Sequence, residues 1–271
     1  ILGKTTGVVT ATVSTDTAAA LNTALTNATT GTDVLTLTVN GATAQATDLI
    51  GLDNKTSVDV SVTATAVSGT FANLNTVYVT NVANYVNLGD ENVTITDTTS
   101  ASNVNIILGA TSGNVTAIVT ADTAAALNTA LTNATTGTDA LTLTINDTTL
   151  TSVSDLLALD GKTNVAVNAS SVNSISETIA NLNTAYNSAG ISGLGNENIS
   201  ITNTGTITAA QINDLLGETS GTITFVGSGN LAITMTSGET LNLSGITNSL
   251  SGNLSITDST GNENITGTSA N

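Results

Sequence analysis

Short stretches in which apolar and polar residues alternate recur along the chain. Val, Leu, Ile or Ala takes every second place in them, and Thr, Ser, Asp or Asn lies between. Such alternation of β-branched residues is typical of half-buried β-strands. The pattern therefore predicts short strands at residues 9–13, 35–39, 58–62, 93–96, 115–119, 141–145, 165–169 and 199–202.

A second kind of segment lies between these strands. Residues 16–25 begin with Asp16 as a predicted N-cap and continue through Ala and Leu, both strong helix formers. Leu21 and Leu25 fall on one helical face, and Gly31 provides a stop. Weaker segments of the same kind are residues 47–50, 154–157 and 208–216. The sequence thus predicts a short helix or turn after each strand.

The chain repeats itself. Residues 122–139 copy residues 16–33 letter for letter, a displacement of 106 residues, and the strand pattern returns with it. A strand and a short helix recurring in this way indicate a stacked repeat architecture. We therefore expect a mainly β fold, a parallel β-solenoid with one short strand and one short helix or turn per coil of about 22–35 residues.

The repeat also predicts the division of the chain. We expect a first four-coil unit at residues 1–106, a second at 107–213, and divergent C-terminal coils or a cap at 214–271. In each unit the third coil carries the longest insertion, which holds nearly all the aromatic residues. Ile1 has the same phase as Ile107, so we expect no N-terminal cap and a chain that joins a longer array.

Composition narrows the classes of function. The net charge is -17, only Lys4, Lys55 and Lys162 are basic, and 39% of residues are hydrophobic. Nucleic acid and anionic lipid both require clustered Lys or Arg, so neither is an expected partner. No apolar run approaches the ~20 residues of a membrane span, so we expect no membrane insertion. The absence of Cys fits an extracellular protein that uses no disulfides.

Two segments carry a family resemblance. Residues 156–170, LLALDGKTNVAVNAS, and residues 191–197, ISGLGNE, resemble the repeats of giant bacterial cell-surface and secreted proteins, especially those of marine cyanobacteria. The similarity spans both 106-residue units and weakens after Gly217. The resemblance implies an extracellular or cell-surface location and a structural role, and it supplies no catalytic residues.

The residues themselves argue against an enzyme. Without His or Cys, the candidates for catalysis reduce to carboxylates, Ser, Thr, Lys and Tyr. Lys55 and Lys162 follow Asp53 and Asp160 in equivalent turns, where a lysine could act in catalysis or in covalent cross-linking. A recurring turn ion pair explains them better, because such surface pairs are common. We expect no enzymatic activity.

Acidic turns raise the question of a metal. Asp90, Glu91, Glu197 and Glu263 are candidate Ca²⁺ ligands, because carboxylate and amide oxygens suit this cation. One or two carboxylates per turn make a thin site, and capping of the turn before the next strand is the favoured interpretation. Apart from this candidate Ca²⁺, no cofactor is expected.

Thr-x-Thr pairs are the most distinctive expected surface feature. Residues i and i+2 of a strand lie ~6.7 Å apart and neighbouring strands ~4.8 Å apart, so stacked pairs would form a lattice of hydroxyl and methyl groups. Such a lattice suits an ordered surface such as ice, although β-propensity alone also favours exposed Thr. The candidate surface-binding residues are Thr10, Thr12, Thr36, Thr38, Thr94, Thr96, Thr142 and Thr144.

Together these observations predict an extracellular structural repeat protein. We expect it to associate with itself end to end into a fibre, or to form part of a long surface stalk or layer, with other copies or neighbouring repeats as partners. The alternative is an adhesin or an ice- or crystal-binding module that uses the Thr-x-Thr face.

Overall fold

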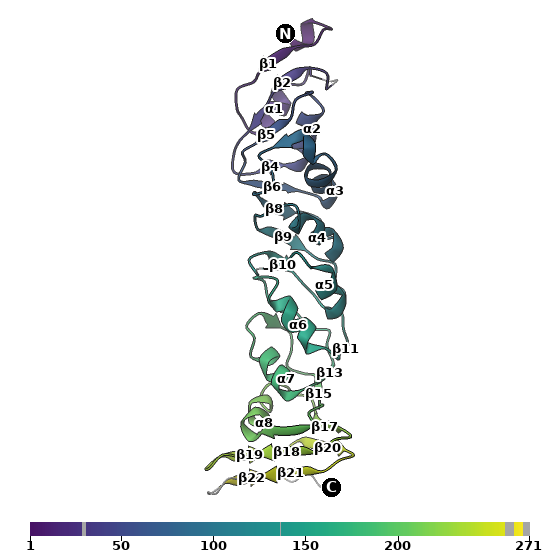
Figure 1. Ribbon diagram of the computed structural model, residues 1–271, viewed down its shortest axis with the longest axis vertical. Coiled ribbons are helices and arrows are strands. Elements are labelled where there is room, and N and C mark those ends of the chain that lie inside the picture. Colours follow the sequence, from purple (N-terminus) through teal and green to yellow (C-terminus); the bar gives the residue numbers. More distant parts are fainter. Residues whose placement is uncertain (29–30, 136, 258–262, 268–271) are drawn as a thin grey trace. The chain divides into compact units, whose positions relative to one another are not determined.

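The computed structural model describes residues 1–28, 31–135, 137–257 and 263–267 (Figure 1). The chain forms two compact units. The first contains Ile1–Thr120, Ala130–Thr142 and Lys162–Asn164, and the second contains Ala121–Thr129, Leu143–Gly161 and Val165–Asn271. Both units combine short parallel strands with helices, and none of the sheets in the described ranges closes into a barrel.

The strands of the first unit form parallel sheets in which each strand pairs with one of the next chain segment. In the largest sheet, Val93 pairs with Val67 and with Val115, which lie 26 and 22 residues away. The sheets are β1 (Thr10–Thr12) with β2 (Val34–Thr36); β3 (Thr38–Val39), β5 (Val60–Val62) and β7 (Tyr85–Val86); and β4 (Ala44–Gln45), β6 (Ala66–Gly69), β8 (Asn92–Ile95), β9 (Val115–Ile118) and β10 (Ala140–Thr142).

The second unit follows the same rule of pairing. Ile199 pairs with Ile175 and with Ile223, each 24 residues away. Its sheets are β11 (Thr149–Leu150), β13 (Ser174–Glu177), β15 (Asn198–Ile201), β17 (Ile223–Gly227) and β20 (Ile246–Leu250); β12 (Val167–Asn168) with β14 (Ile191–Ser192); β16 (Gly205–Thr208), β18 (Leu231–Thr234) and β21 (Leu254–Thr257); and β19 (Thr240–Asn242) with β22 (Asn264–Thr266).

The helices are short and pack in order along each unit. Helix α2 packs on α3 and α3 on α4 in the first unit, and Figure 1 shows these helices on one side of the strands. Helices α6, α7 and α8 pack in the same way in the second. The helices are α1 (Ala18–Ala24), α2 (Ala46–Asp53), α3 (Phe71–Asn75), α4 (Ala101–Leu108), α5 (Ala124–Ala130), α6 (Val153–Asp160), α7 (Ile179–Tyr186) and α8 (Ala209–Leu215), with the 3₁₀ helices η1 (Leu2–Lys4) and η3 (Val82–Asn84) and the π-helix η2 (Thr76–Thr80). Within the described part of the chain, no helix has the length and apolar character needed to cross a membrane.

Local capping fixes where the helices begin. At α1 the N-cap is Thr17, whose hydroxyl accepts from the Ala20 N–H, so the expectation that Asp16 caps this helix is wrong. Asp16 lies one residue earlier, bridges to Val39, and accepts from the Thr17 N–H. Ser100 caps α4 through the Asn103 N–H. Each such side chain satisfies a backbone donor that the helix itself leaves unpaired.

The core lies between the strands and the helices. In β8 alternate residues point inward, so that Val93 and Ile95 are buried and Thr94 is exposed. Leu49 and Leu52 of α2 and Leu37 are wholly buried. Each buried Leu side chain stabilises the fold by about 1.5–3 kcal/mol, so apolar stacking between successive segments is the main stabilising contribution.

The eight predicted strands and the predicted helices are all present, but the segments between them contain further strands that the sequence did not predict. Residues 35–39 do not form one strand: β2 pairs with β1, β3 pairs with β5, and the buried Leu37 lies between β2 and β3. Further strands such as β4 and β6 lead into α2 and α3. Ala and Gly, which are depleted in strands, make up much of β4 and β6, so the alternation of β-branched residues that marks a strand is missing there.

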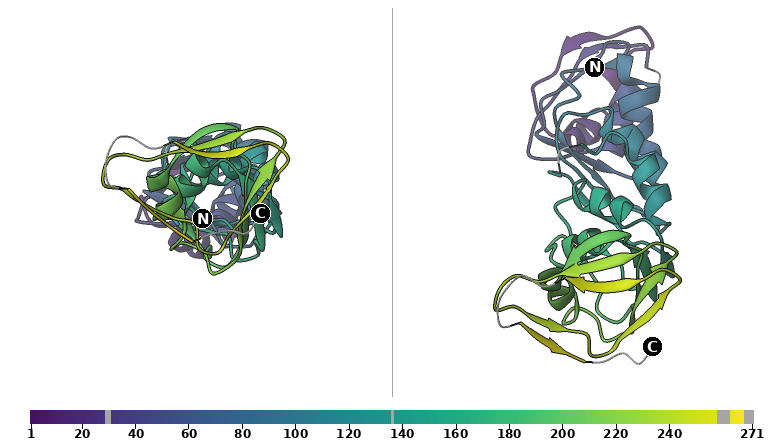
Figure 2. Two further views of the ribbon diagram at one scale, coloured as in Figure 1. Left: turned by 90° about the horizontal axis from the view of Figure 1, so that it is seen from below. Right: turned by 60° about the horizontal axis from the view of Figure 1, so that its bottom comes forward.

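The C-terminal segments differ from the earlier ones in their secondary structure. From Ile223 onward each segment carries three strands and, among the described residues, no α-helix (green to yellow in Figure 2). Ile223 pairs with Ile246, Leu231 with Leu254 and Thr240 with Asn264. From Ile223 onward a third strand therefore takes the place of the helix in each described segment.

The stacked core makes a direct prediction about stability. Leu37→Ala removes a wholly buried side chain between β2 and β3, so we expect a loss of about 2–5 kcal/mol in the free energy of unfolding. Ile118→Thr changes a side chain that is 54% exposed, and we expect a change within about 0.5 kcal/mol. Urea unfolding followed by circular dichroism measures both. Equal effects of the two substitutions would contradict the assignment of the core.

Candidate functional site

A buried glutamate organises residues 89–92, called here the Glu91 turn. Glu91 is 3% exposed, and its Oε2 accepts from the Tyr78 hydroxyl at 3.2 Å and from the Gly89 N–H at 2.8 Å. Tyr78 comes from η2, inside the long insertion of this unit. A carboxylate taken out of water requires such donors, because an unpaired buried charge costs several kcal/mol.

The same construction recurs at residues 195–198, the Glu197 turn. Glu197 is 0% exposed, and its Oε2 accepts from the Tyr186 hydroxyl at 2.8 Å. The Gly195 N–H reaches both carboxylate oxygens, at 3.1 and 2.9 Å, and the Asn196 N–H reaches Oε2 at 3.1 Å. This carboxylate is therefore held by more donors than that of Glu91. Both glutamates cap their turns, as the sequence favours.

The following chain segment locks each turn in place. The hydroxyls of Thr111 and Thr219 donate to the backbone carbonyls of Glu91 and Glu197, both at 2.7 Å. Two residues later, Gly113 lies so close that an added Cβ would collide with the Glu91 carbonyl. Gly is required there by the close backbone approach and not by its own torsion angles.

Burial of the tyrosines changes their acidity. Burial raises the pKa of the Tyr78 and Tyr186 phenols well above the ordinary value, and the adjacent Glu91 and Glu197 carboxylates raise it further. Burial also raises the pKa of the Tyr85 phenol, with a smaller contribution from the charge of Asp53. Each phenol thus stays protonated in the folded chain, which keeps Tyr78 and Tyr186 as donors to the carboxylates.

The candidate Ca²⁺ ligands do not gather into one site. Asp90 is exposed beside the buried Glu91, Glu197 lies in the Glu197 turn, and Glu263 lies just before β22. Over the described ranges there is no cluster of three or more His, Cys, Asp or Glu residues that could hold a metal ion. Asp90 and Glu91 alone bring two carboxylates to one turn.

The lysines have a different role from the one expected. Lys55 Nζ donates to the Leu25 carbonyl at 3.1 Å, and Lys162 Nζ donates to the Leu131 carbonyl at 2.8 Å. Leu25 is the C-cap of α1, where a positive charge is favourable. The expected pairing of each lysine with the preceding Asp is therefore wrong, and both lysines stabilise the end of an earlier helical segment.

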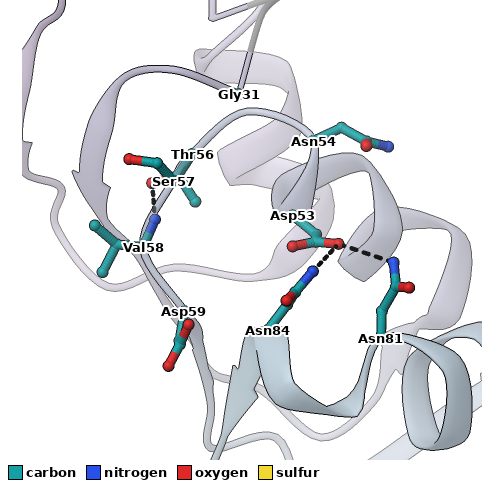
Figure 3. A pocket seen from close by; sticks show the side chains of 9 residues that line it. All are labelled: Gly31, Asp53, Asn54, Thr56, Ser57, Val58, Asp59, Asn81 and Asn84. Carbon is teal, nitrogen blue, oxygen red and sulfur yellow. Dashed lines mark hydrogen bonds between the residues drawn. The ribbon is translucent and has the colours of Figure 1, made fainter.

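The Asp residues beside the lysines tie down the long insertions. Asp53 Oδ2 accepts from the side-chain amides of Asn81 and Asn84, at 3.2 and 3.1 Å (Figure 3). These residues line a pocket of about 370 Å³ whose other side chains are Asn54, Thr56, Ser57, Val58 and Asp59, next to Gly31. In the second unit, Asp160 Oδ2 accepts from the Ser188 hydroxyl at 2.6 Å. The charged group at the centre of the pocket thus serves the packing of the insertion.

The Thr residues do not form one lattice. Thr36 lies in the sheet of β1 and β2, Thr38 lies in the sheet of β3, β5 and β7, and Thr142 lies beside Ile118. Hydroxyl-bearing residues pair across strands in shorter rows, where Thr12 pairs with Thr36, Ser68 with Thr94, and Thr94 with Thr116. The remaining candidates are Thr10 in β1, Thr96 just after β8, and Thr144, which bridges to Asn168. Binding of an ordered surface by these residues stays a prediction.

Reasoning from the sequence missed the Tyr–Glu pairs. Tyr78 and Glu91 are 13 residues apart and Tyr186 and Glu197 are 11 apart, so a tyrosine precedes a Gly-Asp/Asn-Glu-Asn turn in both units. This recurrence was the available signal. A spacing that differs by two residues conceals it, and only the path of the insertion shows that the two side chains meet.

The two turns predict different costs for losing the tyrosine hydroxyl. Tyr78→Phe leaves Glu91 with the Gly89 N–H as its one remaining hydrogen-bond donor among the described contacts, and we expect a loss of about 1–3 kcal/mol in unfolding free energy. Tyr186→Phe leaves Glu197 with its backbone donors, and we expect about 0.5–1.5 kcal/mol. Urea unfolding of both variants gives the comparison. A larger loss for Tyr186→Phe would refute this ranking.

The raised tyrosine pKa values predict alkaline instability. Their contribution to stability is fully present below the unfolded phenol pKa of about 10 and is lost as pH rises above it, because the unfolded chain then releases protons that the folded chain retains. Phenolate absorbance should therefore appear together with the loss of circular dichroism. Free titration near pH 10 in a chain that remains folded would show that the phenols are not buried.

Comparison with protein-family models, with curated proteins and with solved structures found no match to this chain. The structure presents polar side chains that bond to the backbone of a neighbouring chain segment, and exposed Thr on short strands.

Proposed function

We propose that the chain is an extracellular structural repeat protein whose successive coils stack as a parallel β-solenoid with short helices. The coils serve as the material of a fibre, or of a long stalk or layer at a bacterial cell surface. Other copies of the chain or neighbouring repeats are its partners. The location rests on the resemblance to giant bacterial surface proteins and on a composition with a net charge of -17 and no Cys.

One observation carries this proposal: polar contacts between successive segments are copied from one repeat to the next. The carboxylates of Asp33 and Asp139 accept from the N–H groups of Val9 and Val115, both at 2.7 Å. Each donor lies 24 residues before its acceptor. The equal distances show that the repeated residues hold the backbone in the same manner in both copies.

Buried threonine hydroxyls also make the same contacts in both repeats. Thr56 Oγ1 donates to the Leu35 carbonyl and Thr163 Oγ1 to the Leu141 carbonyl, both at 2.8 Å. Each hydroxyl also accepts from the N–H of that Leu at 3.0 Å. A group that bridges two backbone atoms of the neighbouring segment favours one register of stacking over a shifted one.

The reactive side chains are used for this stacking, which argues for a structural role over a catalytic one. Lys55 and Lys162 donate to backbone carbonyls, and Glu91 and Glu197 accept from tyrosine and backbone donors. An enzyme requires a nucleophile or a general base within reach of a substrate. The pocket around Asp53 is lined almost wholly by polar side chains, whereas small-molecule sites are mostly apolar.

Electron microscopy of the purified chain tests the proposal. A solenoid with a rise of about 4.8 Å per coil gives narrow rods of uniform width, and self-association gives fibres with a repeat equal to one subunit. Fibres indicate a polymer, and separate rods indicate a stalk. Compact round particles would contradict the solenoid, and hydrolase or transferase activity lost on Glu91→Gln would contradict the structural role.

A further inference from the structure

A second pocket lies beside the Glu91 turn, within the first unit. Its volume is about 320 Å³, and its lining residues are Val62, Thr63, Ala64, Thr65, Asn87, Asp90 and Glu91. It brings an exposed carboxylate and a buried one to the same wall. Asn87 has a positive φ of 58° and donates its amide nitrogen to the Ser61 hydroxyl at 3.0 Å, so its amide oxygen remains available as a ligand.

The buried carboxylate has an oxygen that the protein does not satisfy. Glu91 Oε2 takes both donors, whereas Oε1 is buried and has no hydrogen-bond partner. In the Glu197 turn the corresponding Oε1 accepts from the Gly195 N–H. Two turns that are otherwise alike thus differ at one atom. An unpaired oxygen on a carboxylate that is 3% exposed is costly, and a cation is the partner that removes this cost.

The sequence differs at the same place. The first turn reads Gly-Asp-Glu-Asn, with Asp90 before the glutamate, and the second reads Gly-Asn-Glu-Asn, with Asn196. Asp90 therefore adds a second carboxylate only in the turn whose glutamate has an oxygen without a partner. The extra carboxylate of Asp90 and the unpaired Glu91 Oε1 thus occur in the same turn, as a cation site requires.

We propose that the pocket at the Glu91 turn binds Ca²⁺, with the Glu91 Oε1 and the Asp90 carboxylate as charged ligands. The Asn87 amide oxygen and oxygens of Thr63 and Thr65 supply neutral ligands, and water completes the coordination. Ca²⁺ accepts six to eight oxygen ligands in flexible geometry, whereas Mg²⁺ demands a near-ideal octahedron. With two carboxylates the affinity belongs to the weak range of extracellular modules, a Kd of about 10⁻⁴–10⁻³ M.

The test exploits the second turn as a template. Asp90→Asn gives the first turn the Gly-Asn-Glu-Asn sequence that already folds at residues 195–198. The variant should therefore retain the melting temperature of the parent chain in chelator. Asn196→Asp is the matched control, because it adds a carboxylate where the Glu197 oxygens already have backbone donors.

Calcium is titrated against each chain at constant ionic strength, with isothermal titration calorimetry for affinity and thermal unfolding for stability. For the parent chain we expect one bound Ca²⁺ and a melting temperature raised by about 2–4 °C at a concentration of ten times Kd. Asp90→Asn should weaken binding at least about tenfold, since it removes one of two charged ligands. Asn196→Asp should leave the single site unchanged, and Mg²⁺ should not substitute for Ca²⁺.

Terbium luminescence locates the ion. The chain has three Tyr and no Trp, and the hydroxyl of Tyr78 lies next to Glu91, so bound Tb³⁺ should be sensitised by tyrosine and displaced by Ca²⁺. Absence of a calcium effect on the parent chain would overturn the proposal. So would unchanged affinity in Asp90→Asn, or a new equal site in Asn196→Asp. Electron microscopy in the presence of chelator tests the structural role separately, because rods or fibres that form without calcium do not depend on this site.

Discussion

Parallel backbone pairing between chain segments 22–26 residues apart is the interaction on which the rest of this structure depends. A parallel partner can be reached only by a connection that carries the chain back to its starting edge, so successive strands of each sheet begin at the same edge. The chain contains no Pro, which keeps every backbone N–H available to these ladders. Apolar side chains then become buried only because the next segment covers them.

Buried polar groups give this stacking its register. Asp139, Thr163 and the two glutamates each bond to backbone atoms of a nearby turn or a neighbouring segment, so a shift of one residue would leave several of them without partners. Leaving a buried polar group unpaired costs about 1–3 kcal/mol, which exceeds the net gain from forming its hydrogen bond. These contacts, which recur in both repeats, thus serve mainly to disfavour a shifted strand register.

The negative net charge of the chain opposes both folding and self-association. The net charge of -17 produces self-repulsion, and two of the three lysines bind backbone carbonyls at the ends of helical segments. A divalent cation at the Glu91 turn would reduce this repulsion at the one described turn where adjacent carboxylates include a buried oxygen without a partner.

The sequence by itself determined the repeat, the eight alternating strands and the Ala- and Leu-rich helix of each unit, because these follow from periodicity and local propensity. Only the tertiary structure decided which side chains meet. Residues 35–39 lie in two sheets, which separates Thr36 from Thr38. The two lysines bind carbonyls at the ends of helical segments and not the neighbouring Asp. The tertiary structure also joined Tyr78 to Glu91 and left one carboxylate oxygen without a partner. Such contacts depend on the path of the chain between segments, and short strands and insertions leave no periodic signal of that path.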